Sequence, residues 1–295
     1  MAEIEGLVRA LRKGRVAAKT DAAWALHNLA RPQRDNGANR IAIAEAGGIP
    51  PLVDLLRDGR VEAKEEAARA LGTLAHNDDA NKVAIAEAGA IPQFVEVLSG
   101  WSQQIWAHER LANAKEEAAR ALRNLARNNN ANKVAIAEAG GVRPLVDLLR
   151  NGWQGRSRRY PMEVLHFLAR NNDANTVAIA EAGGVPPLVD LLRDGSNGTD
   201  TKWQAADTLH RLAANNDANA VAIALAVGSL KVLVELARRG RVTVNERRIV
   251  RNAGVPAKRK AALVVAALLR ACVPVEVRSR ADVRDVIRGV VGPYL

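Results

Sequence analysis

NRIAIAEAGGIPPLVDLLRDG, residues 39–59, decides the fold, because near-copies of this stretch return along the chain. The copies begin at Asn81, Asn132 and Asn175 and, in weaker form, at Asn219. Measured between Glu45, Glu87, Glu138, Glu181 and the equivalent Leu225, the spacings are 42, 51, 43 and 44 residues. Self-similarity at a period of about 20 to 50 residues is typical of a stacked array of small units rather than of a globule with one core.

Three helices are expected in each unit. The first is short, Asn39–Ala46, and the glycine pair that follows it favours the left-handed conformation that closes a helix. The second carries Pro50 and Pro51 in its first turn, where a missing N–H is tolerated, and runs to Gly59. The third, Val61–His76, has apolar residues at three-and-four spacing. Asn/Asp-rich corners after each third helix suit both its exit and the N-cap of the next helix.

The pattern AAxALxNLAxNxxANKVAIAEAGGIPPLVDLL resembles the armadillo repeat over about residues 4–271. The short, glycine-stopped first helix favours this family over two-helix HEAT-type repeats. The resemblance implies an all-α fold, a right-handed α-solenoid of about five to six three-helix armadillo repeats. It also implies that the third helices line a long concave groove.

One continuous solenoid domain is expected, because each unit of such an array contacts only its neighbours. The expected segments are a partial N-terminal repeat or cap at 1–36, repeats at 37–78, 79–129, 130–173 and 174–217, a degenerate repeat at 218–271 and a C-terminal capping segment at 272–295. Residues 1–14 align with a second helix, so the chain begins inside a repeat. A degenerate cap and a fragment of a longer protein both remain open as explanations.

Two places depart from the template. The long spacing puts an insertion at 99–113, whose Trp101 and Trp106 either anchor a partner or fold over the neighbouring second helix. In the next unit Pro161 interrupts the third helix. Because proline disfavours a helix interior, we expect that helix to start near Pro161 and residues 154–160 to form a basic loop.

Charge is distributed unevenly along the chain. The net charge is +11, but residues 231–295 hold 15 Lys/Arg against 5 Asp/Glu, and the repeats before them are nearly neutral. This balance argues against a groove built mainly for a phosphate backbone. The single cysteine, Cys272, excludes an internal disulfide framework. With no membrane-spanning stretch or signal peptide in view, a cytoplasmic or nuclear location is expected, and the protein is expected to be neither secreted nor transmembrane.

Peptide-binding armadillo proteins such as the nuclear-import adaptors carry, by this resemblance, Trp followed four residues later by Asn on the third helix. An asparagine amide both donates and accepts hydrogen bonds, so it can hold the backbone of an extended peptide without reading its sequence. Here the pair occurs once, at Trp24 and Asn28. The aligned pairs are Arg69 and Thr73, Arg120 and Asn124, Glu163 and Phe167, and Asp207 and Arg211. The groove therefore differs in chemistry from that of the import adaptors.

The candidate groove residues combine these pairs with aligned neighbours. They are Trp24, Asn28, Arg69, Thr73, Glu116, Arg120, Arg123, Asn124, Arg127, Glu163, Phe167, Trp203, Asp207 and Arg211. The mid-array arginines could grip a ligand carboxylate or phosphate through bidentate hydrogen bonds. Alternatively, Glu65 with Arg69 and Glu116 with Arg120 are helical pairs four residues apart that only decorate a solvated face.

No motif indicates catalysis. The chain has no Gly-rich phosphate loop, no Cys/His metal spacing and no recognisable nucleophile motif, so no enzyme, cofactor or metal site is expected. The leading hypothesis is a scaffold or adaptor that binds an extended peptide segment of a partner protein in the groove. The alternatives are docking of the basic end, 241–288, on nucleic acid or an anionic membrane, and an armadillo fragment of a larger protein. A homodimer through an uncapped end is also open.

Overall fold

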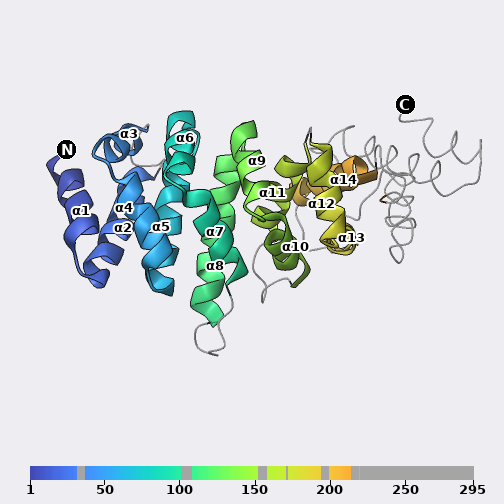
Figure 1. Cartoon of the computed structure of the whole chain (residues 1–295), viewed down its shortest axis with the longest axis horizontal. Helices are drawn as coiled ribbons and strands as arrows, with labels where there is room; N and C mark the ends of the chain where they lie inside the picture. The colour runs from blue at the N-terminus through green and yellow to red at the C-terminus, as the bar shows by residue number, and fades with distance from the viewer. Residues whose placement is uncertain are drawn as a thin grey trace, which may run out of the picture. The chain divides into compact units, whose positions relative to one another are not determined.

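The computed structural model describes residues 1–31, 37–100, 108–151, 158–170, 172–193, 199–213 and Asn219. These residues form helices, turns and no strand. The helices are α1 (Ala2–Lys13), α2 (Val16–Ala30), α3 (Ala38–Glu45), α4 (Ile49–Asp58), α5 (Val61–Leu74), α6 (Asp79–Glu87), α7 (Ala90–Ser99), α8 (His108–Ala126), α9 (Asn130–Glu138), α10 (Val142–Asn151), α11 (Arg159–Ala169), α12 (Asp173–Glu181), α13 (Val185–Arg193) and α14 (Thr199–Ala213) (Figure 1). The all-α solenoid expected from the sequence is confirmed.

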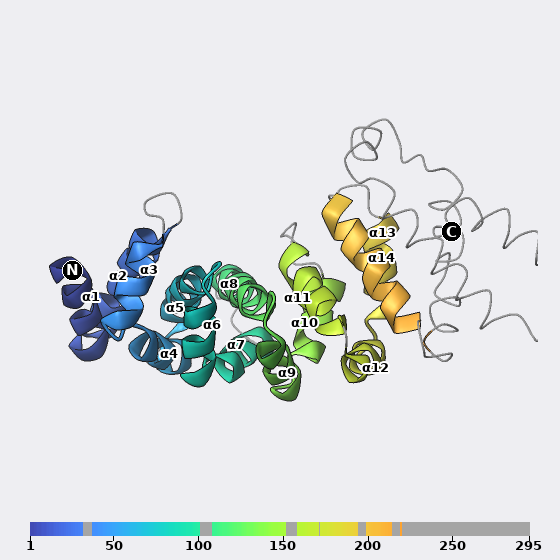
Figure 2. The same cartoon turned by 90° about the horizontal axis from the view of Figure 1, so that it is seen from above.

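The chain divides into two compact units, Met1–Leu145 with Trp153–Phe167, and Val146–Gly152 with Leu168–Leu295. In the first unit, α5 packs against α2 before it and α8 after it, while α4 packs against α1 and α7. Figure 2 shows α2, α5 and α8 following one another along one side of this unit, with α4 and α7 on the other. The third helices therefore form a row, as the armadillo resemblance implies.

Residues 1–14 do form a second-type helix. Ile4, Val8 and Leu11 of α1 are buried, and α1 packs against α2 and α4. This apolar face of α1 supplies the same kind of contact that α4 supplies with Leu52 and Leu56. The start of the chain is thus part of the helical stack.

The glycine stops are confirmed. Gly47, Gly89, Gly140 and Gly183 each adopt a positive φ, between 71° and 79°, directly after a first helix. A side chain is strained in this conformation, so glycine ends the helix with little strain. The glycine after Gly47 is needed for space, because a Cβ on Gly48 would lie 2.9 Å from the carbonyl oxygen of Ile43.

Within the described residues, the Asn/Asp-rich corners end the third helices and cap the first helices that follow, as predicted from the sequence. Asn77 and Asn128 take the left-handed conformation, with φ of 53° and 58°. The side chains of Asp78 and Asn129 then accept hydrogen bonds from the backbone N–H of Asn81 and Asn132, at 3.0 and 2.9 Å. These N-caps hold the first turn of α6 and α9.

The same asparagines that begin each first helix have a second structural role. Asn81 and Asn132 are buried, and their Nδ2 atoms donate to the carbonyl oxygens of Leu74 and Leu125 at 3.2 and 3.1 Å. In the second unit Asn175 donates to Leu168 at 3.0 Å. Each bond ties the start of a first helix to the end of the third helix before it.

Both departures from the template lie partly in helices. The last residues of the predicted insertion, 108–113, belong to α8, which is 19 residues long against 14 for α5. The expected basic loop at 154–160 is wrong at its end, since α11 begins at Arg159. Pro161 lies in the first turn of α11, where its missing N–H removes no helical hydrogen bond. Trp101, Trp106 and residues 152–157 lie outside the described residues.

In the second unit, α14 packs against α12 and α13. Arg150 donates through Nη2 to the carbonyl oxygens of Ala182 and Gly183, both at 3.2 Å, and so caps the end of α12. The degenerate repeat at 218–271, apart from Asn219, the capping segment at 272–295 and the basic end at 241–288 lie outside the described residues. The segment boundaries, the alternative of docking on nucleic acid or membrane and the homodimer remain predictions.

Candidate functional site

The first column of candidate residues runs across the three packed third helices of the first unit. It consists of Trp24 on α2, Arg69 on α5 and Arg120 on α8, one aligned position per helix. Trp24 is 56% exposed, which is unusual for the largest apolar side chain. Arg69 and Arg120 are half-buried. This column combines an exposed aromatic ring with two positive charges.

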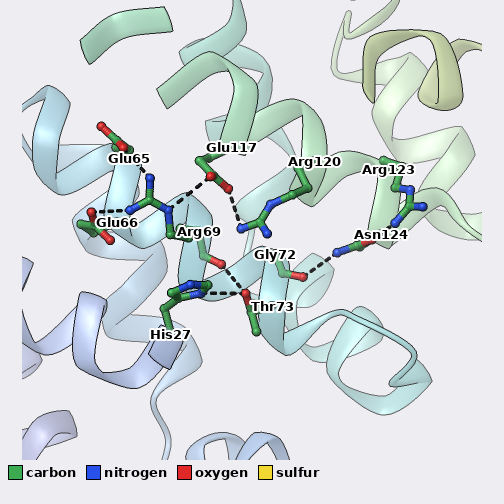
Figure 3. A network of polar contacts seen from close by, with 10 residues as sticks. All are labelled: His27, Glu65, Glu66, Arg69, Gly72, Thr73, Glu117, Arg120, Arg123 and Asn124. Atoms are coloured by element: carbon green, nitrogen blue, oxygen red, sulfur yellow. Dashed lines mark hydrogen bonds and ion pairs between the residues drawn. The ribbon is translucent and has the colours of Figure 1, made fainter. Parts of the chain in front are cut away.

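Arg69 lies at the centre of a carboxylate cluster (Figure 3). Its guanidinium donates to Glu65 at 2.5 Å, to Glu66 at 2.6 Å and, across the helix boundary, to Glu117 at 3.2 Å. The other oxygen of Glu117 forms an ion pair with Arg120 Nη2 at 2.5 Å. The predicted helical pair of Glu65 and Arg69 is therefore present, but it is one part of a network that joins α5 to α8.

The electrostatics of this cluster follow from its half-burial. Burial opposes the charge on Arg69, yet the carboxylates of Glu117 and Glu66 outweigh it and raise the pKa of Arg69. Burial raises the pKa of Glu66 above its usual value, and the neighbouring Glu65 adds to that rise. Three carboxylates thus share the guanidinium groups of Arg69 and Arg120, so the cluster keeps an excess of negative charge.

The second column lies four residues after the first on each helix. Its side chains form hydrogen bonds with backbone carbonyl oxygens of the protein itself. Asn28 Nδ2 donates to the carbonyl oxygen of Trp24 at 3.0 Å, and the Thr73 hydroxyl donates to that of Arg69 at 2.9 Å. Asn124 is only 7% exposed, and its Nδ2 donates to the carbonyl oxygen of Gly72 on α5 at 2.7 Å. Asn124 therefore joins α8 to α5, as Figure 3 shows.

His27 belongs to the same network. Its Nδ1 lies 2.9 Å from the Thr73 hydroxyl oxygen, and because that hydroxyl donates to Arg69, we assign the ring proton to Nδ1. Burial, followed by the positive charges of Arg120, Arg69 and Arg31, lowers the pKa of His27 from 6.5 to about 4. The ring is neutral at physiological pH and works as a hydrogen-bond donor between α2 and α5.

A second ionic bridge lies further along. Glu163 of α11 is 4% exposed and accepts from Arg123 Nε and, at 2.7 Å, from Arg159 Nε. Arg123 also donates to the Asn124 side-chain oxygen at 2.9 Å. A carboxylate this buried is stabilised because two guanidinium groups flank it. Glu163 and Arg123 are thus held by internal partners.

The remaining predicted residues lie in different surroundings. In the first unit, Glu116 and Phe167 are half-buried, while Arg127 is exposed in the turn after α8. In the second unit, Asp207 is 1% exposed and accepts from Arg211 at 2.9 Å, and Trp203 on the same helix is half-buried. Burial lowers the pKa of Arg211.

Two features of the site were not predicted from the sequence. The first is that Glu117 and Glu163 bind arginines on neighbouring helices, which repeat spacing does not reveal. The second is Arg40 on α3, a buried arginine outside the third helices. Its alignment with Lys82 gave a signal, because a cation recurs there on a first helix.

No group of His, Cys, Asp and Glu arranged to hold a metal ion occurs within the described residues. Those same ranges contain no helix with the length and apolar character needed to cross a bilayer.

The fold and the row of third helices define a class, the α-solenoids of three-helix repeats. The profile of the Armadillo/beta-catenin-like repeat matches residues 36–76 and 172–214. These two segments of the chain therefore match the armadillo repeat, which supports the resemblance seen in the sequence.

Solved structures share this fold. An engineered protein is similar at 28% identity with a TM-score of 0.69, over 92% of this chain and 98% of that one. A designed armadillo repeat protein is similar at 24% identity with a TM-score of 0.68, over 90% and 99%. Another designed armadillo repeat protein, in complex with the peptide (KR)4, shares 24% identity with a TM-score of 0.66, over 90% and 99%. No curated protein matches the chain.

Proposed function

We propose that this chain is a non-catalytic interaction module, a scaffold or adaptor that binds an extended segment of a partner protein on the face formed by α2, α5 and α8. One observation carries the proposal. Trp24, 56% exposed, stands in line with Arg69 and Arg120 on three helices that pack in succession. Armadillo repeats commonly mediate protein binding, and such scaffolds are generally not enzymes.

The chemistry of the face suggests a ligand of mixed character. The ring of Trp24 suits an aliphatic or cationic side chain. The carboxylates around Arg69 favour a positive group beside it, while Arg120 and Arg127 favour a negative one further on. A designed armadillo repeat protein of this fold binds a peptide of alternating Lys and Arg. Here we propose a segment in which apolar and charged residues alternate, because both signs of charge lie along the row.

The two asparagines have different roles in this proposal. Asn28 is half-buried, and within the described residues its side chain bonds to the Trp24 carbonyl oxygen of its own helix turn, so its amide oxygen can hold the backbone of a ligand. The side-chain amide of Asn124 instead donates to the Gly72 carbonyl oxygen and so holds α8 against α5. Trp24 and Asn28 are therefore the proposed ligand-binding pair, and Asn124 is the residue that fixes the spacing of the row.

Selection from a random-peptide library tests this function. The library is applied to the immobilised parent, to Trp24→Ala and to a matched control, Val83→Ala, which truncates an exposed apolar side chain on α6. We expect one motif to be enriched on the parent and on the control, and to bind Trp24→Ala at least tenfold more weakly, ~1.4 kcal/mol. Equal enrichment on all three proteins, or none on the parent, would contradict the proposal.

A cytoplasmic or nuclear location is part of the proposal. It is supported by the single cysteine, since a chain with one cysteine needs no oxidising compartment to form internal disulfides.

A further inference from the structure

Arg40 carries a buried charge for which the described residues supply no counter-ion. The residue lies on α3 and is 9% exposed. Its Nε and Nη1 atoms are buried and have no hydrogen-bond partner in the part of the chain that the structure describes. Buried polar groups are nearly always satisfied, and a buried charge is costly when it is unpaired. Two nitrogens of this guanidinium are therefore left without the acceptor that a buried charge needs from the described residues.

Comparison with the other repeats shows how this position loses its internal partner. The aligned Lys82 is also buried, and it donates to Asp79 at 2.7 Å and to the carbonyl oxygen of Arg127 at 3.0 Å. In the next repeat Lys133 donates to Asn130 at 3.0 Å. In both cases the acceptor side chain stands three residues before the cation. The equivalent of Asp79 in the repeat of Arg40 is Gly37, which has no side chain.

The glycine also fits the guanidinium closely. A Cβ on Gly37 would lie 2.9 Å from Arg40 Nη2, and Gly37 has a φ of 104°, a conformation that favours glycine. Arg40 thus folds back over the start of α3, where the first N–H groups of the helix give a positive potential. In this repeat, the position that carries the acceptor Asp79 in the next repeat is a glycine, and the surface there is positively charged.

The neighbouring side chains add further positive charge. The pKa of His76, at the end of α5, is lowered by burial and then by the charges of Arg123, Arg40 and Arg127, while the Asn124 side chain raises it. Arg123 has Glu163 as its carboxylate partner. Arg127 is exposed in the turn after α8. At the corner between the start of α3 and the ends of α5 and α8, three arginines thus lie within electrostatic reach of His76.

We propose that this corner is an oxyanion site, in which Arg40 donates to a carboxylate or phosphate group, with His76 and Arg127 beside it. Two features carry the inference. The buried guanidinium has two nitrogens with no acceptor among the described residues, and a glycine replaces the acceptor found in the equivalent pairs. The site shares Arg127 with the proposed peptide face, but its main donor, Arg40 on α3, lies outside the helices of that face, so the two proposals can fail separately. Charge-assisted hydrogen bonds to such a group are strong when the donor is already desolvated.

Thermal unfolding and NMR titration with inorganic phosphate and with acetate, each against chloride at equal ionic strength, test the site. The proteins are the parent, Arg40→Met and the control Lys82→Met. In chloride, Arg40→Met is expected to be as stable as the parent or more stable, because a buried unpaired charge is removed. Lys82→Met is expected to be less stable, because Asp79 and the Arg127 carbonyl lose their donor.

Phosphate is expected to raise the unfolding temperature of the parent and of Lys82→Met, and to bind Arg40→Met at least tenfold more weakly, as followed by the His76 ring signals. If acetate also raises the unfolding temperature, the site accepts carboxylates. If only phosphate raises it, the site is specific for phosphate. An equal phosphate response in Arg40→Met would overturn the proposal. So would a loss of stability or of folding by Arg40→Met in chloride, since it would show that Arg40 is satisfied within the chain.

Discussion

His27 shows how contact between neighbouring repeats changes the pKa and the hydrogen bonding of a single residue. Its ring donates to Thr73, which in turn donates to the backbone of Arg69, so one neutral histidine links α2 to α5. The surrounding arginines and burial disfavour its charged form. The same logic places Asn124 between α8 and Gly72, and Glu163 between two arginines. Polar residues in the candidate row therefore serve the packing of the helices as well as any ligand.

The lowered pKa of His27 makes stability depend on pH. The folded protein binds this proton only near pH 4, whereas the unfolded chain binds it near 6.5. The contribution is therefore complete above pH 6.5 and is lost as the pH falls towards 4, by about 1–2 kcal/mol after allowance for partial exposure. Urea unfolding of the parent and of His27→Gln from pH 7 to 4 checks this, with the parent expected to lose more. Parallel pH profiles would show that His27 titrates normally in the folded state.

Asn132 gives a second prediction at this scale. Its buried amide donates to the Leu125 carbonyl oxygen, so Asn132→Ala leaves that oxygen without its donor and is expected to lower the free energy of unfolding by about 1–3 kcal/mol. The control is Asn130→Ala, on the exposed start of α9, expected within about 0.5 kcal/mol of the parent. Chemical denaturation measures both. Similar losses in the two variants would contradict the assigned role.

At the scale of the helix, α5 and α8 approach each other closely at Gly72 and Ala121. Gly72 is buried on α5, and a Cβ there would lie 3.2 Å from both Cα and Cβ of Ala121 on α8. Two small residues thus let the backbones meet, and the Asn124 amide can then reach the Gly72 carbonyl oxygen. This contact fixes the distance between Arg69 and Arg120, and with it the spacing of the candidate face.

We therefore expect Gly72→Leu to destabilise the protein by at least about 2 kcal/mol, because the added atoms meet backbone atoms that no rotamer change can move. The matched control is Gly6→Ala on α1, where no atom lies within 4 Å of the added Cβ. Removing glycine from that helix interior is expected to stabilise by roughly 0.5–1 kcal/mol. Thermal denaturation compares the two. A Gly72→Leu variant as stable as the parent would mean that α5 and α8 pack less closely.

Elements that depend on local chemistry could be predicted from the sequence. The glycine stops, the asparagine corners and the start of α11 near Pro161 need only the residues beside them. The partners of Arg69 and Arg123 could not be predicted, because Glu117 and Glu163 lie 48 and 40 residues away. Repeat alignment shows which residues share a column, but not which side chains reach across to the next helix. Gly72 was a signal of close packing, since a glycine inside a helix needs a reason.

At the scale of the molecule, the repeat explains both the fold and the limits of what its residues can do. Asparagines such as Asn81 and Asn132 recur because every repeat needs the same bond from a first helix to the preceding third helix. Residues that differ from their counterparts in the other repeats are not required by this packing and are the candidates for a functional role. Trp24 is exposed where its counterparts are charged, and Gly37 stands where Asp79 binds a cation. The two proposed sites rest on these departures.

The most direct test of the central claim is the indole N–H signal of Trp24 in a two-dimensional NMR titration with the enriched peptide. The signal is assigned by its loss in Trp24→Ala. We predict that this resonance shifts in a saturable manner, together with backbone signals of α2, α5 and α8. A peptide that binds the parent while leaving the Trp24 signal unchanged, and that shifts other indole resonances instead, would contradict the assignment of the binding face to the third helices.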